Sequence, residues 1–130
     1  PRVDQGERIF NFWFNAGELT TRMEEIDREA LIHNEMPMTL SFFPPGEGNE
    51  AQPVVKLSDE VVQLTAFKKA ETSGDYIIRL FEPTGQERET IIKLPYFDLE
   101  KKIELAPFAI VTLKLTEDGK LEETDLIEGK

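Results

Sequence analysis

Alternating apolar and polar positions dominate the chain from Pro53 onward, and this pattern predicts a series of short β-strands. Both faces of segment 76–81 are partly apolar, as in a strand packed within a sandwich. Strands that recur about every 8–12 residues indicate a sandwich or a barrel, and we predict an antiparallel β-sandwich. The strand candidates are 54–57, 61–68, 76–81, 89–94, 102–105, 109–115 and 120–126.

Turn-forming residues separate several of these strands. Segment 72–75, which reads Thr-Ser-Gly-Asp, interrupts the pattern before the strand at 76–81. Segment 83–85 reads Pro-Thr-Gly and predicts a turn whose glycine is free to take a positive φ. Segment 116–119 ends in Asp-Gly and predicts a hairpin turn into the last strand.

The pattern before residue 53 is mixed. Phe10, Phe12 and Phe14 share one face of a strand that we predict over residues 7–14, and Trp13 lies on the opposite face. These rings could form a sugar-stacking platform, with Trp13 as the residue to test. Alternating phenylalanines are more common in a core, so we expect the three rings to be buried.

One helix is predicted after this strand. Thr21 and Glu24 have the spacing of a capping box, and apolar residues follow at helical intervals. We therefore predict a helix from about residue 21 to residue 33, closed by Asn34 and Pro37.

A short apolar strand is predicted over residues 38–43, followed by a breaker-rich surface loop at 44–50. The fold class is therefore mainly β, an antiparallel sandwich with one short α-helix near the N-terminus. We predict a single domain over residues 1–130, with an alternative boundary in the loop 44–52. Because the chain opens at Pro1 without an initiator methionine, we expect an excised piece of a longer protein.

Charge and composition narrow the classes of partner. Acidic residues outnumber basic ones by 26 to 15, giving a formal net charge of −11. A nucleic-acid binder needs a basic face to replace counterions, so we expect no nucleic-acid partner. No apolar run approaches the roughly 20 residues of a membrane-spanning helix, and we expect no membrane partner. The absence of cysteine excludes thiolate chemistry and fits a reducing compartment, so we expect a cytoplasmic protein.

The ionisable residues predict neither a catalytic residue nor a metal ligand in this chain. We interpret the acidic residues of the predicted helix, including Glu24, as its solvated face, and we interpret Asp59 and Glu60 as solvated residues beside a turn. His33 is the single histidine, and its place at a helix end predicts a favourable interaction with the helix dipole. A zinc site built from nitrogen and oxygen usually needs more histidines.

Two short motifs carry a family resemblance. Segment 77–85 reads I-I-R-L-F-E-x-x-G and segment 105–112 reads L-A-P-F-x-I-x-T, preceded by K-x-A-E at 68–71. In this order the motifs resemble the C-terminal β-sandwich of alpha-mannosidases of glycoside hydrolase family 38. Segment 4–7, followed by Phe10 and Phe12, is similar to a D-x-G-x-H-x-F strand that precedes the sandwich in bacterial and cytosolic members.

The resemblance implies an accessory C-terminal domain of a zinc-dependent alpha-mannosidase. The zinc and the nucleophilic aspartate then belong to an N-terminal catalytic domain, which would be this chain's partner together with a mannosyl substrate. No cofactor is expected in the chain itself. The expected substrate-cleft or domain-interface contacts are Asp4, Gln5, Gly6 and Trp13.

Some positions depart from the family pattern. Many members have His where Glu7 or Arg8 stands, and Pro-His where Asn15-Ala16 stands. A similar bacterial branch acts on a phosphorylated mannosyl-glycerate, which is an alternative substrate for the parent. Two other functions stay open: a carbohydrate-binding module with Trp13 or Tyr96 stacking on sugar, and a structural interaction domain.

Overall fold

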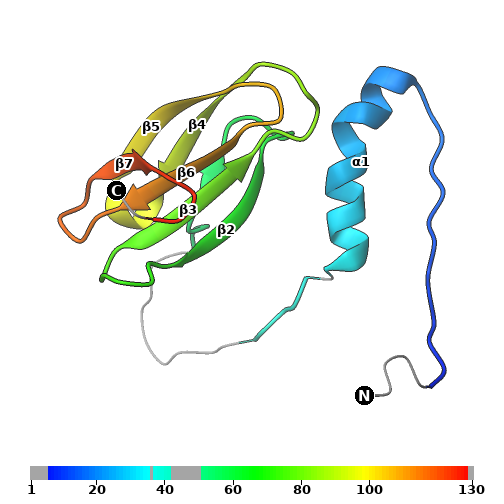
Figure 1. The fold of residues 1–130 in the computed structure, drawn as a ribbon, viewed down its shortest axis with the longest axis horizontal. Helices are drawn as coiled ribbons and strands as arrows, with labels where there is room; N and C mark the ends of the chain where they lie inside the picture. The colour runs from blue at the N-terminus through cyan, green and yellow to red at the C-terminus, as the bar shows by residue number, and fades with distance from the viewer. Residues whose placement is uncertain (1–5, 36, 42–50, 129–130) are drawn as a thin grey trace.

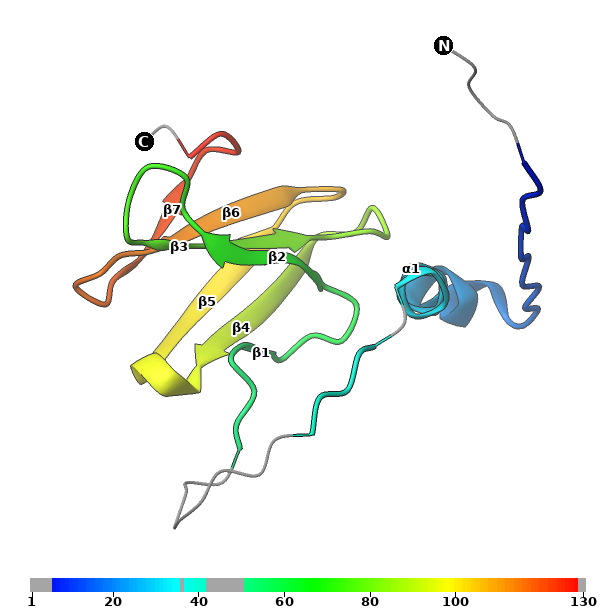
Figure 2. The same cartoon turned by 90° about the horizontal axis from the view of Figure 1, so that it is seen from below.

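A computed structural model describes residues 6–35, 37–41 and 51–128 of the chain. Two antiparallel sheets face each other, and one helix stands beside them (Figures 1 and 2). The elements in chain order are α1 (Leu19–Asn34), β1 (Lys56–Leu57), β2 (Gln63–Lys69), β3 (Tyr76–Phe81), β4 (Arg88–Leu94), the 3-10 turn η1 (Pro95–Phe97), β5 (Leu99–Leu105), β6 (Ile110–Leu115) and β7 (Leu121–Thr124). The predicted mainly β sandwich with one N-terminal helix is confirmed.

The sheets have the strand orders β1-β4-β5 and β2-β3-β6-β7. All neighbouring strands pair antiparallel, and the turns predicted at 72–75 and 116–119 join β2 to β3 and β6 to β7. The chain crosses from one sheet to the other three times, between β1 and β2, between β3 and β4, and between β5 and β6. The crossings from β3 to β4 and from β5 to β6 lie at the same end of the sandwich (Figure 2), and a hydrogen bond between Phe108 and Glu82 joins them.

Alternate residues of the strands fill the space between the sheets. Ile78 and Leu80 of β3 and Leu113 of β6 are fully buried, as are Ile92 and Leu94 of β4. A period of two places such residues on one face of each sheet, which explains why the alternation in the sequence predicted β3 with its observed bounds. β1 and β7 are shorter than predicted.

The strand predicted over residues 7–14 is wrong. No residue of this segment lies in a strand or bridge, and all of its side chains are exposed. Phe14 is 98% exposed and Phe10 is 73% exposed, so the expectation of buried rings is also wrong. A strand needs a neighbour to receive its backbone hydrogen bonds, and none of the described residues pairs with this segment.

The strand predicted at 38–43 fails in its described part, since residues 37–41 form no strand. The loop at 44–50 lies outside the described residues, and so does most of the alternative domain boundary at 44–52. The single domain and this boundary both stay predictions.

The helix α1 begins two residues before the predicted start. Its N-cap is Glu18, whose carboxylate accepts the Thr21 backbone N–H at 3.0 Å. The predicted capping box is therefore wrong, because Thr21 already lies in the first turn of the helix. No residue of α1 is buried, although Met23 and Ile26 are apolar. No helix formed by the described residues has the length and apolar character needed to cross a bilayer.

Candidate functional site

Two of the four predicted contact residues, Gly6 and Trp13, lie in the described part of the chain, before α1. Asp4 and Gln5 fall outside the described residues. Gly6 is exposed with a φ of 118°, a backbone conformation that favours glycine. Trp13 is 54% exposed, and its ring stacks on His33 with ring centroids 4.7 Å apart and planes inclined by 13°.

A groove of about 690 Å³ lies between residues 11–15 and α1. Trp13 and Ile26 contribute to its apolar wall, and a polar bridge crosses it. In this bridge the Glu29 carboxylate accepts hydrogen bonds from the Arg22 guanidinium at 2.9 Å and from the Asn15 amide at 3.0 Å. Hydrogen bonds from Arg22 and then from Asn15 lower the pKa of Glu29, so this carboxylate is an ionised bridge between segment and helix.

The side chains present do not fit a zinc site. Among residues 6–35, 37–41 and 51–128, no three His, Asp or Glu side chains converge to hold a metal ion. The imidazole of His33 lies in the last turn of α1, as predicted, but it is stacked on Trp13.

The most constrained polar group of the described chain is the Glu82 carboxylate, which is fully buried. It accepts backbone N–H groups from Thr84 at 2.8 Å, Gly85 at 2.7 Å, Gln86 at 3.2 Å and Phe108 at 3.1 Å. The Thr84 hydroxyl also donates to it. Successive N–H groups pointing at one anion form a concave site of the kind called a nest.

These hydrogen bonds keep Glu82 ionised in spite of its burial. Burial alone raises the pKa of a carboxyl group because it disfavours the charged form. The donors Thr84, Phe108 and Gly85 outweigh this effect and lower the pKa of Glu82 from 4.5 to about 2. A general acid needs the opposite shift, so the geometry gives Glu82 a role in holding the backbone.

Gly85 is required by this turn for two reasons. Its φ is +73°, as the Pro-Thr-Gly pattern predicted. A Cβ at this position would also meet the ring of Phe108, which would have to move aside. The two motifs that carried the resemblance, at 77–85 and 105–112, therefore meet at one carboxylate and one aromatic ring.

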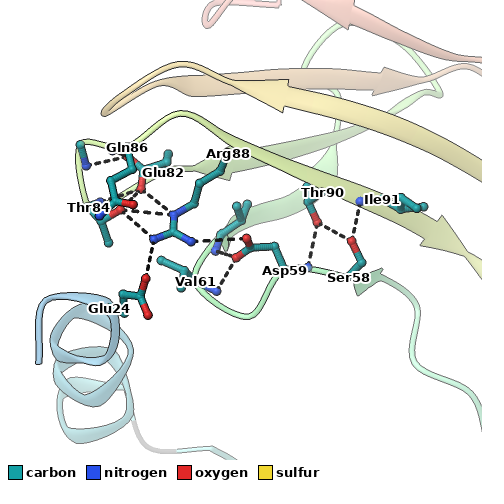
Figure 3. Close-up of polar contacts among 12 residues, drawn as sticks. Glu24, Ser58, Asp59, Val61, Glu82, Thr84, Gln86, Arg88, Thr90 and Ile91 are labelled. Carbon is teal, nitrogen blue, oxygen red and sulfur yellow. Dashed lines mark hydrogen bonds and ion pairs between the residues drawn. The ribbon is translucent and has the colours of Figure 1, made fainter. Parts of the chain in front are cut away.

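Arg88, the first residue of β4, contacts the Glu82 carboxylate and three other side chains (Figure 3). Its Nε donates to Glu82 at 3.2 Å, and its Nη1 lies 3.5 Å from Asp59. Its Nη2 donates to Glu24 of α1 at 3.2 Å and to the Thr84 hydroxyl at 3.2 Å. The Arg88 side chain is only 12% exposed.

Asp59 ties a second loop to this arginine. One of its carboxylate oxygens accepts the backbone N–H groups of Val61 at 2.7 Å and Val62 at 3.1 Å, while the other faces Arg88. The backbone N–H of Asp59 donates to the Thr90 hydroxyl at 3.2 Å. We refer to Glu24, Asp59, Glu82, Thr84 and Arg88 as the arginine cluster.

The sequence analysis missed the arginine cluster. Its interpretation of Asp59 as solvated is wrong, because that carboxylate is engaged by backbone N–H groups and Arg88. Glu24 was assigned to a solvated helix face, but it pairs with Arg88. The signal in the sequence that points to the cluster is Glu82, an acidic residue directly after a buried strand with Gly85 three positions later. A turning backbone offers its N–H groups to a carboxylate at such a position.

A comparison with protein families places the strand-rich part of the chain in a known family. The family described as glycosyl hydrolases family 38 C-terminal beta sandwich domain matches residues 61–129, which is more than half of the chain. Neither the curated proteins nor the solved structures gave a match. The matched part runs from the start of β2 to beyond β7 and includes most of the arginine cluster, whereas α1 lies before it.

The family description, a C-terminal β-sandwich domain, agrees with the observed fold. The matched residues contain both complete motifs and all strands of the sheet β2-β3-β6-β7. A C-terminal domain of family 38 implies an N-terminal catalytic domain in the parent protein. The chain belongs to the family of glycosyl hydrolase family 38 C-terminal beta sandwich domains.

Proposed function

We propose that this chain is the accessory C-terminal domain of a zinc-dependent alpha-mannosidase and supports the catalytic domain that hydrolyses alpha-mannosyl linkages. The observation that carries the proposal is the family match over residues 61–129. The parent is proposed to be a bacterial, cytoplasmic enzyme that holds zinc in its catalytic domain. Its substrate is an alpha-mannoside or, as the alternative, a phosphorylated mannosyl-glycerate.

The role proposed for the chain itself is non-catalytic. Glu82 and Asp59 are committed to backbone N–H groups and to Arg88, and Glu29 is committed to Arg22 and Asn15. Hydrolysis of a glycosidic bond needs one carboxyl group that can donate a proton and a second that attacks or activates water. Because these carboxylates are engaged in structural contacts, their arrangement supports a scaffolding role for the chain.

The N-terminal segment and α1 supply a surface for a neighbouring domain. Phe12, Phe14 and Ile26 are exposed by 80%, 98% and 55%. Neighbouring exposed apolar side chains of this kind mark interaction surfaces. Gly6 and Trp13, with Asp4 and Gln5, are the proposed contacts to the catalytic domain or to its substrate cleft.

An activity assay tests the proposal. The 130-residue chain should not hydrolyse an aryl alpha-mannoside with or without added zinc, whereas the parent protein should do so. Removing residues 61–129 from the parent should lower its activity or its stability. Turnover by the isolated chain above the buffer rate would contradict the accessory role, and a parent enzyme inactive on every alpha-mannoside would contradict the substrate.

The second candidate function is a carbohydrate-binding module, which the groove beside Trp13 favours. Trp13 is the only tryptophan, so a change in its emission can be assigned. Titration with mannose or mannobiose should change this emission if a sugar enters the groove, and Trp13→Ala should abolish the heat of binding measured by calorimetry, which needs no tryptophan. Tyr96, the other ring considered, is 62% exposed, and its hydroxyl donates to the Gln52 carbonyl at 3.0 Å.

A further inference from the structure

We propose that Arg88 is a positioning residue that holds α1 against the end of the β-sandwich through its ion pair with Glu24. This inference goes beyond the proposed accessory function, because it concerns how the N-terminal part is held on the matched domain. It is independent of the substrate and of zinc.

Apolar packing does not attach α1 to the sheets. No residue of α1 is buried, and Ile26 and Ile32 are 55% and 50% exposed. In both ribbon views the helix stands beside the sandwich as a separate element (Figures 1 and 2). Leu31 of α1 faces Leu57 and Val62 across a groove of about 420 Å³. The apolar surfaces on the two sides of this groove are therefore incompletely closed.

Charged contacts connect the two parts instead. Glu24 accepts a hydrogen bond from Arg88 at 3.2 Å, and Arg28 lies 3.7 Å from Glu60. The second pair is weak because its side chains are 60% and 89% exposed, and exposed pairs contribute little. The pair of Glu24 with Arg88, whose side chains are 40% and 12% exposed, is the stronger connection.

Arg88 is fixed before it meets the helix. Glu82 holds its Nε at 3.2 Å, Thr84 accepts from the same nitrogen at 3.3 Å, and Asp59 faces its Nη1. A free arginine loses side-chain entropy when it forms an ion pair, but most of this freedom is already lost in the cluster. Figure 3 shows the guanidinium directed from β4 toward the helix, with Glu24 pointing back at it.

Because Arg88 lies at a crossing between the sheets, its ion pair with Glu24 fixes α1 to that end of the sandwich. Glu82 directly follows β3 and Arg88 begins β4, so both lie at the crossing between the sheets. The same helix carries the wall of the groove beside Trp13. Arg88 therefore sets where that groove lies relative to the matched domain.

The test uses the full chain with spin labels on α1 and β7. The chain has no cysteine, so Asp27→Cys and Glu123→Cys, both at exposed positions, provide specific labelling sites. The variant is Glu24→Gln, which keeps the shape and removes the charge. The control is Glu25→Gln, whose carboxylate pairs with Arg22 of the same helix. Arg88 itself is left in place because its loss would leave Glu82 buried without its cation.

Pulsed electron resonance then measures the distance distribution between the labels. The labelled parent chain and Glu25→Gln should give one narrow distribution that broadens with added salt. Glu24→Gln should be broad at every salt concentration, with the released population raised about fivefold, the factor that an ion pair of this kind supports. The melting temperature of the sandwich should stay the same.

Two results would overturn the inference. One is a Glu24→Gln distribution as narrow as that of the control. The other is a broad distribution in the labelled parent chain that does not respond to salt, a measurement that needs no change in the arginine cluster.

Discussion

The backbone N–H of Phe108 lies 3.1 Å from the carboxylate of Glu82, 26 positions earlier in the chain. One residue follows β3 and the other precedes β6, so this bond joins two of the three crossings between the sheets. The carboxylate is fully buried and the Phe108 ring lies beside Gly85. The stability of the sandwich should therefore depend strongly on this one anion.

Replacing Glu82 with alanine should destabilise the domain by about 3–5 kcal/mol, because it leaves Arg88 without its buried partner and four backbone N–H groups without their acceptor. Urea unfolding followed by circular dichroism measures this loss. The control is Glu89→Ala, which removes an exposed carboxylate paired with Lys102 and should cost less than about 1 kcal/mol. Equal losses in the two variants would contradict the special role of Glu82.

Acid should weaken the domain through the same carboxylate. The pKa of Glu82 is about 2 in the folded chain against an ordinary 4.5, so the unfolded chain binds its proton more readily. The stabilisation is complete above about pH 4.5 and is lost as the pH falls toward 2. The free energy of unfolding, measured between pH 2 and pH 6, should therefore decrease as the pH falls.

The matching variant is Glu82→Gln, whose side chain does not titrate. Its unfolding free energy should change less across the same window, and the difference from the parent chain isolates Glu82 from the other groups with lowered pKa, such as Glu29 and Glu128. If the free energy of unfolding depends on pH identically in both proteins, the titrating group is not Glu82.

Gly85→Ala should destabilise the sandwich more than Gly119→Ala. Both glycines have positive φ, at 73° and 80°. A Cβ at Gly85 would meet the Phe108 ring and displace it, whereas a Cβ at Gly119 meets nothing within 4 Å. We expect about 1 kcal/mol for Gly119→Ala from backbone strain alone and more for Gly85→Ala. Thermal unfolding of both variants provides the comparison.

A second substitution tests the cause of that difference. Phe108→Ala removes the ring that the new Cβ would meet, and Phe108 is 65% exposed, so the ring itself contributes little to the core. In a Phe108→Ala background the extra cost of Gly85→Ala should shrink toward that of Gly119→Ala. An unchanged cost would assign the whole effect to the backbone.

The aromatic N-terminal segment should be dispensable for stability. Phe14 is 98% exposed, and Phe14→Ala should change the unfolding free energy by less than about 0.5 kcal/mol. Leu80 is fully buried between the sheets, and Leu80→Ala should cost about 2–5 kcal/mol. A large loss for Phe14→Ala would mean that the ring packs in the isolated chain.

The sequence predicted the sandwich well because its core follows a local rule. The alternation through β3 identifies buried residues such as Ile78 and Leu80, and turn residues fix the hairpin ends. The same rule failed for residues 7–14, because alternation reports what a strand could bury and not whether a neighbouring strand exists. Phe10 and Phe12 satisfy the pattern but have no sheet to join among the described residues.

The candidate site was harder to predict, for a different reason. Glu82 and Phe108 are distant in sequence, and the local pattern from Glu82 to Gly85 points to bonds within that turn but not to the bond from Phe108. In the sequence, Asp59 and Glu24 cannot be distinguished from ordinary surface acids. Their pairing with Arg88 depends on the fold, which brings the three side chains together. Of the predicted contacts, the structure describes Gly6 and Trp13 and places Trp13 on His33 of the helix.

The strand order also has a kinetic consequence. The pairs β2-β3, β4-β5 and β6-β7 are neighbours along the chain, whereas the pairing of β3 with β6 spans a loop that contains β4 and β5 of the opposite sheet. Closing that long loop carries an entropic cost that slows folding. The contact between the Glu82 carboxylate and Phe108 spans the same loop, so its formation reports when the two ends of that loop come together during folding.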